Sequence, residues 1–153
     1  MNALTLLERD HRAVERLLDE LEPTTERGVK TRTELFERIK SELTLHELIE
    51  EEIFYPTLKQ HPRAKEIVLE GYEEHDVVNL LLGELDRLPV DDETWGAKAK
   101  VMSENIQHHI EEEEGDMFDK ARQVFDSDEL EALGEQMAAR KAQALDELTG
   151  VAR

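Results

Sequence analysis

Apolar residues recur along this 153-residue chain at alternating steps of three and four, the spacing of a helix with one buried face. The pattern predicts helices over residues 2–22, 31–60, 63–88, 93–124 and 128–148. Four long helices joined by short connections are typical of an up-down-up-down bundle. We therefore expect an all-α four-helix bundle over residues 1–125. Residues 126–153 should form an additional C-terminal helix that packs on this domain or extends it.

Local signals place the helix ends. Asn2 is a good N-cap for the first helix, and Asp126 or Ser127 for the fifth. Pro56 should bend or end the second helix, with one extra turn through Leu58 as the alternative. Gly115 lies inside the fourth helix, where it costs about 1 kcal/mol relative to alanine. A close contact or a local backbone adjustment would explain it.

Polar residues interrupt the core-facing series of every long helix. The second helix carries His46 and Glu50 at core positions, and the fourth carries His109 and Glu113. In each pair the imidazole and the carboxylate are four residues apart, so both point to the same side of the helix. The first and third helices each carry one core-facing histidine, His11 and His75.

The chain repeats itself. The segment DHRAVERLLDEL, starting at Asp10, aligns with EHDVVNLLLGEL, starting at Glu74. His11 precedes His46 by 35 residues, and His75 precedes His109 by 34. Two equivalent helical hairpins packed together would have a pseudo-two-fold axis and bring the six polar side chains into one layer of the core.

These six side chains are candidates for a dimetal site. A single histidine in a core is more often hydrogen-bonded than bound to a metal, and a glutamate in a charged run is usually solvated. Burying six such groups without compensation would cost many kcal/mol, which two dications would offset. Imidazoles and carboxylates suit iron, manganese or zinc, and two shared carboxylates can bridge two ions. The predicted ligands are His11, His46, Glu50, His75, His109 and Glu113.

The composition limits the partners. Acidic residues number 38 and basic residues 19, for a formal net charge of −19, which argues against nucleic acid and anionic membranes as partners. Cysteine is absent, so thiolate metal sites and disulfides are excluded. The N-terminal segment lacks the pattern of a signal peptide, and no apolar run has the length of a membrane helix. We expect a cytoplasmic protein.

The motifs resemble those of hemerythrin-like domains with the HHE cation-binding pattern. The similarity is carried by RDHRAVERLL, HELIEEEIFYP, EEHDVVNLLLGEL and HHIEEEEGDMF and covers about residues 1–125. It implies a four-helix bundle around a non-haem diiron centre, oxo- or hydroxo-bridged, with zinc or manganese as alternatives. It also implies that the four histidines are terminal ligands and that Glu50 and Glu113 bridge the ions.

One departure from the oxygen carriers of that family affects the ligand set. Asn79 stands where those carriers have a second histidine on the third helix. Water, Glu47 or a tyrosine could take the open position. Tyr72 lies one helical turn before His75, whereas the helical angle of Tyr55 is less favourable. Ordinary core packing is the preferred interpretation of both tyrosines.

A diiron site of this kind implies reaction with O₂, peroxide or NO. An oxygen ligand in place of a histidine favours the ferric state, so we expect a role in oxidative or nitrosative stress rather than reversible O₂ carriage. Any enzymatic activity would be weak and peroxidase-like or catalase-like. Two other functions stay open. One is an iron- or oxygen-sensing module that contacts a partner or a second copy through the C-terminal helix, and the other is a structural dimetal bundle without redox activity.

Overall fold

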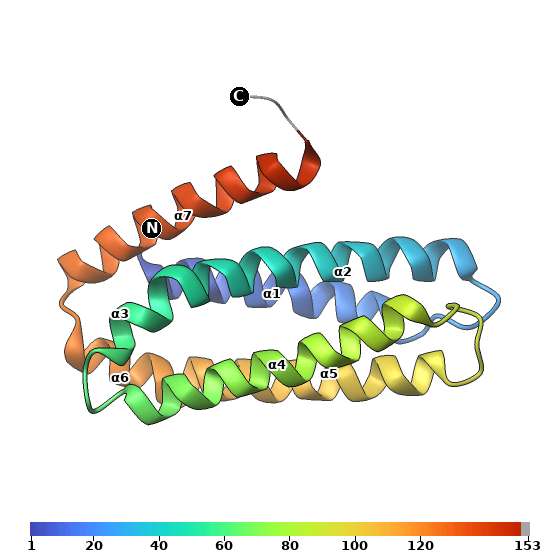
Figure 1. The fold of residues 1–153 in the computed structure, drawn as a ribbon, viewed down its shortest axis with the longest axis horizontal. Helices are drawn as coiled ribbons and strands as arrows, with labels where there is room; N and C mark the ends of the chain where they lie inside the picture. Colours follow the sequence, from blue (N-terminus) through green and yellow to red (C-terminus); the bar gives the residue numbers. More distant parts are fainter. Residues whose placement is uncertain (151–153) are drawn as a thin grey trace.

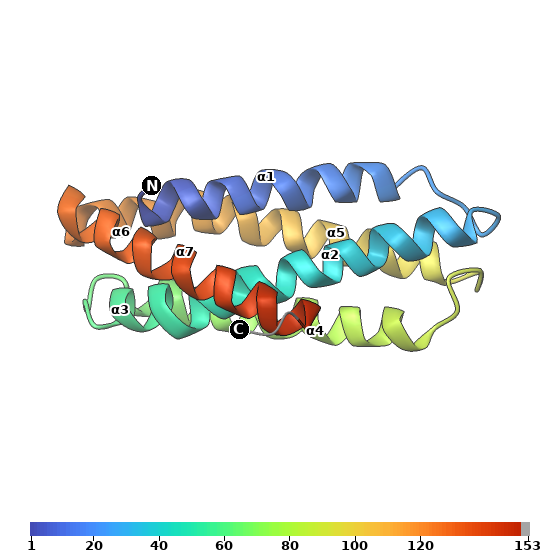
Figure 2. The same cartoon turned by 90° about the horizontal axis from the view of Figure 1, so that it is seen from above.

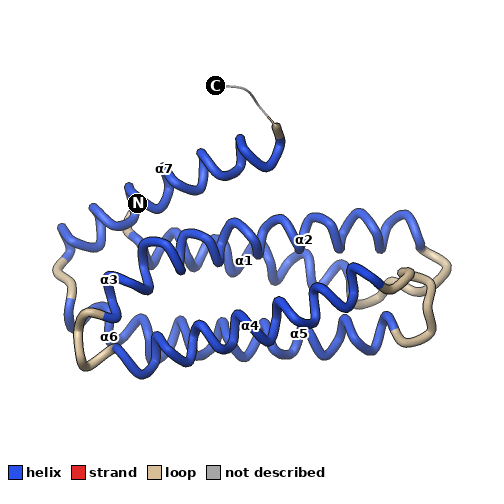
Figure 3. The backbone as a smooth tube through the Cα atoms, in the orientation of Figure 1, coloured by secondary structure: helices blue, strands red, loops and turns tan. Residues whose placement is uncertain are grey.

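The computed structural model of the chain describes residues 1–150 and contains helices but no strand within that range (Figure 3). The expected all-α class is therefore confirmed. Residues 1–150 form seven α-helices and two five-residue π-helical segments. They run α1 (Ala3–Leu21), α2 (Val29–Ile49), η1 (Glu50–Phe54), α3 (Tyr55–Lys59), α4 (Lys65–Arg87), α5 (Trp95–Glu112), η2 (Glu113–Met117), α6 (Phe118–Val124) and α7 (Ser127–Thr149).

Four long helical rods form an up-down-up-down bundle (Figure 1). The first and third rods are α1 and α4. The second is the continuous run α2–η1–α3, and the fourth is α5–η2–α6. The remaining helix, α7, crosses obliquely over the outer face of α1 and α2 (Figure 2). This arrangement leaves the middle of the bundle enclosed by all four rods.

Two apolar clusters fill the bundle core, one towards each end. Each cluster contains side chains from all four rods, so that the layer between them is shut off from water at both ends. The first cluster includes Phe54, Leu58, Phe118 and Met137, and the second includes Phe36, Ile39, Trp95 and Met102.

The second rod differs from the uniform α-helix that the spacing predicts. It winds as a π-helix from Glu50 to Phe54, and Pro56 does not end it, because proline is tolerated in the first turn of the following helix. The rod continues through Leu58, which is the alternative noted above. The extra residue also shifts the buried face, so that Ile53 is only partly buried whereas Phe54 is fully buried.

Gly115 belongs to the second π-helical segment. A Cβ atom added there would meet nothing within 4 Å, so the close contact considered above is wrong and a local change of backbone winding explains the site. The predicted caps are present. Asn2 Oδ1 accepts a hydrogen bond from the Thr5 N–H at 2.9 Å. Asp126 caps α7 in a reciprocal pair with Glu129.

The helix α7 packs on the bundle through a face that includes Leu130, Leu133, Met137 and Ala144. At Gly134 it lies so close to the N-terminus that a Cβ atom would overlap the backbone of Met1 and Asn2. Near its C-terminal end, Leu145 and Leu148 are 45% and 53% exposed. Self-association through this helix stays a prediction. None of the helices described has the length and apolar character needed to cross a membrane.

Candidate metal centre

All six predicted side chains meet in the layer between the two apolar clusters, and all six are buried. They form two groups that share both glutamates, and within each group the potential ligand atoms lie within 4.8 Å of one another. The groups are His11, His46, Glu50 and Glu113, and Glu50, His75, His109 and Glu113. The structure thus brings together the two ligand sets that the repeat predicts.

Glu50 joins the two halves of the chain. Its Oε1 lies 3.2 Å from His46 Nε2 on its own rod and 3.0 Å from His75 Nε2 on α4. Two atoms here are left without a hydrogen bond among the described residues, namely His46 Nε2 and Glu50 Oε2, although both are fully buried. Buried polar atoms without partners are costly, and a cation between them would satisfy both.

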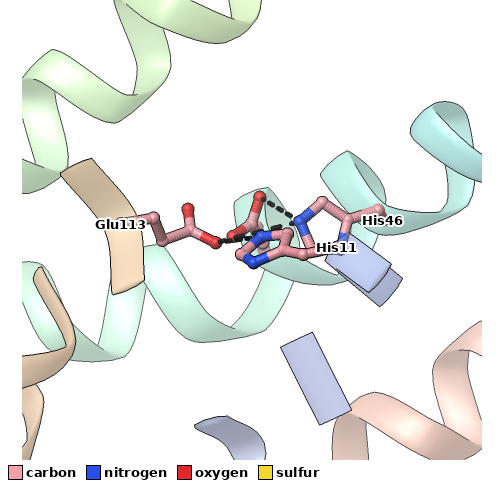
Figure 4. A group of neighbouring side chains, drawn as sticks. His11, His46 and Glu113 are labelled. Atoms are coloured by element: carbon pink, nitrogen blue, oxygen red, sulfur yellow. Dashed lines mark hydrogen bonds and ion pairs between the residues drawn. The ribbon is translucent and has the colours of Figure 1, made fainter. Parts of the chain in front are cut away.

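Glu113 occupies the equivalent position in the second half. Its Oε1 lies 3.1 Å from His11 Nε2, and its Oε2 lies 3.1 Å from His109 Nε2. Figure 4 shows the carboxylate pointing towards the imidazoles of His11 and His46, which come from different helices. Each glutamate therefore lies between a histidine of its own rod and one of the other half.

A second set of carboxylates lies behind the histidines. In each of the four central histidines, Nε2 faces the centre of the site and Nδ1–H donates a hydrogen bond to one of these carboxylates. The pairs are His11 with Glu114 (2.6 Å), His46 with Asp10 (2.9 Å), His75 with Glu51 (2.7 Å) and His109 with Glu74 (2.6 Å). Such contacts hold the ring orientation and tautomer of a metal-binding histidine.

The outer carboxylates follow the internal repeat, although the sequence reasoning missed them. Asp10 and Glu74 each precede the first histidine of their half. Glu51 and Glu114 each follow one of the two shared glutamates, Glu50 and Glu113. All of them except Asp10 stand in runs of acidic residues, so the local sequence does not indicate their role. Their matching positions in the internal repeat are the one sequence signal that distinguishes them.

The carboxylates control the protonation of the imidazoles. Burial alone would lower the pKa of His75, but its hydrogen bonds to Glu50 and Glu51 outweigh this and raise the pKa to about 9. For His109, burial is likewise outweighed by Glu113, and the pKa rises to about 10. Without a cation these two imidazoles therefore favour the protonated form, and a bound metal would replace their protons.

Tyr55 also reaches the centre. Its hydroxyl donates a 2.6 Å hydrogen bond to Glu113 Oε2 and lies 3.4 Å from His75 Nε2 and 3.5 Å from His109 Nε2. Burial, together with the charge of Glu113, raises the pKa of this phenol well above its usual value. The preference for Tyr72 over Tyr55 is wrong: Tyr72 is only partly buried and packs edge-on against the Tyr55 ring at 5.1 Å.

Phe118 is the counterpart of Tyr55 in the second half. Each stands five residues after the shared glutamate of its half, and each follows a π-helical segment. The Phe118 ring stacks on His11 at 6.3 Å, as the Tyr55 ring stacks on His75 at 5.3 Å. Because phenylalanine has no hydroxyl, the two ligand groups differ in the polar atoms that they face.

Glu47 and Asn79 form a pair beside the centre. Asn79 is exposed, whereas its neighbour Val78 is buried. The Asn79 amide donates a 2.8 Å hydrogen bond to Glu47 Oε1, and burial raises the pKa of Glu47. Glu47 is thus tied to α4 next to the second ligand group.

A small cavity of about 20 Å³ adjoins the four imidazoles. Its volume suits a single molecule of the size of water or a diatomic gas. Beyond the four histidines and Glu47, its walls are apolar and come from all four rods: Val14, Leu43, Val78, Ile106 and Ile110.

Comparisons with known proteins agree with this geometry. The chain matches the model of the hemerythrin HHE cation binding domain over residues 2–121. It is 32% identical over 148 residues to the uncharacterized protein Rv2633c of Mycobacterium tuberculosis (strain ATCC 25618 / H37Rv), a match that covers 92% of this chain and 85% of that protein. The uncharacterized protein Mb2666c of Mycobacterium bovis (strain ATCC BAA-935 / AF2122/97) matches to the same extent.

A solved structure is also similar. It is the crystal structure of a hemerythrin HHE cation binding domain-containing protein, the Rv2633c homolog from Mycobacterium kansasii. The TM-score is 0.84 and the sequence identity 28%, over 100% of this chain and 95% of that one. The similarity therefore includes α7 as well as the four rods.

Proposed function

Because the chain belongs to the hemerythrin HHE cation-binding family, we propose that its two ligand groups hold two iron ions that react with hydrogen peroxide, NO or O₂ in an oxidative or nitrosative stress response. The observation that carries the proposal is the pair of overlapping ligand groups joined by Glu50 and Glu113. Bound iron would supply the redox chemistry that the side chains lack. Zinc and manganese suit the same donors, and metal analysis decides among them.

The protein would orient the ligand side chains and exclude water from the site. The outer carboxylates keep each Nε2 directed inwards, so that the histidines need little rearrangement to bind an ion. The apolar walls of the cavity admit a small neutral molecule and disfavour larger or charged ones. This selectivity supports peroxide or a diatomic gas as the ligand.

Tyr55 supports reaction over reversible carriage of O₂. Its hydroxyl lies among Glu113, His75 and His109, where it can hold a proton or offer an oxygen ligand in place of the histidine missing at Asn79. A hard oxygen donor favours ferric over ferrous iron. We also propose that the enzymatic activity of the site is weak and peroxidase-like or catalase-like, and that the protein acts in the cytoplasm.

Metal analysis of the purified protein, with visible spectra before and after addition of hydrogen peroxide, tests the proposal. We expect about two iron ions per chain and absorption bands that change with peroxide. Glu113→Gln should lose bound iron, because the carboxylate shared by the two ligand groups becomes a neutral amide, whereas Glu112→Gln, on the adjacent half-exposed side chain, should retain it. A colourless protein that binds only zinc would leave a structural bundle or a partner-binding module.

A further inference from the structure

The carboxylates behind the first ligand group are each paired with a cation. Lys141 Nζ lies 2.5 Å from Asp10 Oδ1, and Asp10 Oδ2 accepts the Nδ1–H of His46. Arg12 Nη2 lies 2.6 Å from Glu114 Oε2, the carboxylate behind His11. The charge of both carboxylates is therefore shared between an imidazole and a basic side chain.

The carboxylates behind the second ligand group lack such cations. Within residues 1–150, neither Glu51 nor Glu74 has a lysine or arginine nitrogen within 4.0 Å. His108 is 3.6 Å from Glu74, but its side chain is 63% exposed. The second group thus keeps more negative charge behind its imidazoles than the first.

Lys141 belongs to α7, outside the region that matches the family. Its side chain is 27% exposed, whereas that of Asp10 is only 8% exposed, so the contact lies at the edge of the core. The adjacent Arg140 forms a comparable pair with Glu52, 2.7 Å apart, that does not touch a carboxylate bound to a histidine. One α7 cation therefore faces the site and its neighbour does not.

We propose that Lys141 makes the two metal positions unequal, so that dications fill the His75–His109 group before the His11–His46 group. A cation on Asp10 withdraws electron density from the His46 imidazole and adds positive charge near any ion bound there. The first group is therefore the weaker site, and an ion held in it is the more electron-poor of the two. The inference rests on the proposed function in that both groups hold ions.

Titration of the metal-free full-length protein with Co²⁺ alone, followed by its visible spectrum, tests this. The wild type should bind two ions in separate steps. Lys141→Met should raise the affinity of the weaker step by about threefold to tenfold, a modest change because the lysine is partly exposed and screened. Lys141→Arg should leave the two steps as in the wild type, because it keeps the charge.

Arg140→Met is the matched control, since it removes the same charge from the adjacent position of the same helix. It should leave both steps unchanged, and thermal unfolding should show both variants folded. Three results would overturn the inference and leave the dimetal site intact. The affinity of the weaker step could shift equally in Lys141→Met and Arg140→Met, it could stay unchanged in Lys141→Met, or it could fall in Lys141→Met. Fewer than two cobalt ions bound by the wild type would overturn the proposed function, and this inference with it.

Discussion

The hydroxyl of Tyr55 donates a 2.6 Å hydrogen bond to Glu113 Oε2, across the bundle from its own rod. In a uniform α-helix, the fifth residue after Glu50 would point away from the direction of Glu50. The π-helical turn from Glu50 to Phe54 contains an additional residue, which brings Tyr55 back over the centre. The backbone winding, and not only the side-chain pattern, therefore determines which tyrosine meets the six central side chains.

Replacement of this tyrosine should separate its role from that of the histidines. Tyr55→Phe should fold and bind two metal ions, but it should lack any long-wavelength absorption that arises from tyrosinate bound to iron. The metal-free variant should lose about 1–2 kcal/mol of unfolding free energy, because Glu113 Oε2 loses its hydroxyl donor in a buried setting. Visible spectra and urea unfolding of the two forms measure these effects.

Tyr72→Phe removes the same hydroxyl from a neighbouring ring that does not reach the centre. It should retain the spectrum of the wild type and nearly all of its stability. If the two variants had identical spectra, Tyr55 would have no ligand role at the iron.

The sequence predicted the helices and the six central residues because both obey a regular spacing. Steps of three and four residues place His11, His46, His75 and His109 on core faces without knowledge of the tertiary structure. The π-helical turns could not be predicted, because the apolar residues Ile53 and Phe54 are adjacent and either can face the core. The outer carboxylates could not be predicted for a different reason, since nothing in the local sequence distinguishes Glu51 from a solvated neighbour such as Glu52.

Two glycines near the site should respond to alanine in opposite directions. At Gly71 a Cβ atom would lie 2.9 Å from Tyr55 Oη and 3.1 Å from Met117 Cε, so Gly71→Ala should displace the phenol and cost about 1–3 kcal/mol. At Gly115 a Cβ atom would meet nothing within 4 Å, and Gly115→Ala should stabilise by up to about 1 kcal/mol. Thermal unfolding compares the two, and a stable Gly71→Ala with an unchanged spectrum would contradict the packing around Tyr55.

The metal-free protein should become less stable as the pH rises. The pKa of His75 is about 9 and that of His109 about 10 when folded, above the ordinary value of 6.5. Groups with raised pKa values stabilise the folded state fully below about pH 6.5, and this contribution is lost as the pH rises through 9 to 10. For His75 alone the loss is about 3 kcal/mol.

Urea unfolding of chelator-treated protein between about pH 6.5 and pH 9.5 measures this loss. The metal-loaded protein is the control, because its imidazoles would bind metal in place of protons and should not show the same decline. Constant or rising stability of the metal-free form over this range would contradict the raised pKa values of His75 and His109.

The equivalence of Tyr55 and Phe118 permits a gain of interaction. Glu50 Oε2 is buried without a hydrogen bond, whereas Glu113 Oε2 accepts one from the Tyr55 hydroxyl. Phe118→Tyr places a second phenol at the equivalent position, directed by the same π-helical winding towards Glu50. It should stabilise the metal-free protein by about 1 kcal/mol and strengthen any tyrosinate absorption of the iron-loaded form.

Phe54→Tyr is the contrasting variant, since Phe54 is equally buried and its ring meets Phe118 edge-on at 6.3 Å. It places a hydroxyl in the apolar cluster without such an acceptor and should destabilise by about 1–3 kcal/mol. Urea unfolding of both metal-free variants decides the matter. If Phe118→Tyr lost as much stability as Phe54→Tyr, the pseudo-two-fold relation would not extend from the six central residues to the aromatic residues behind them. The two halves would then differ in how these aromatic residues pack.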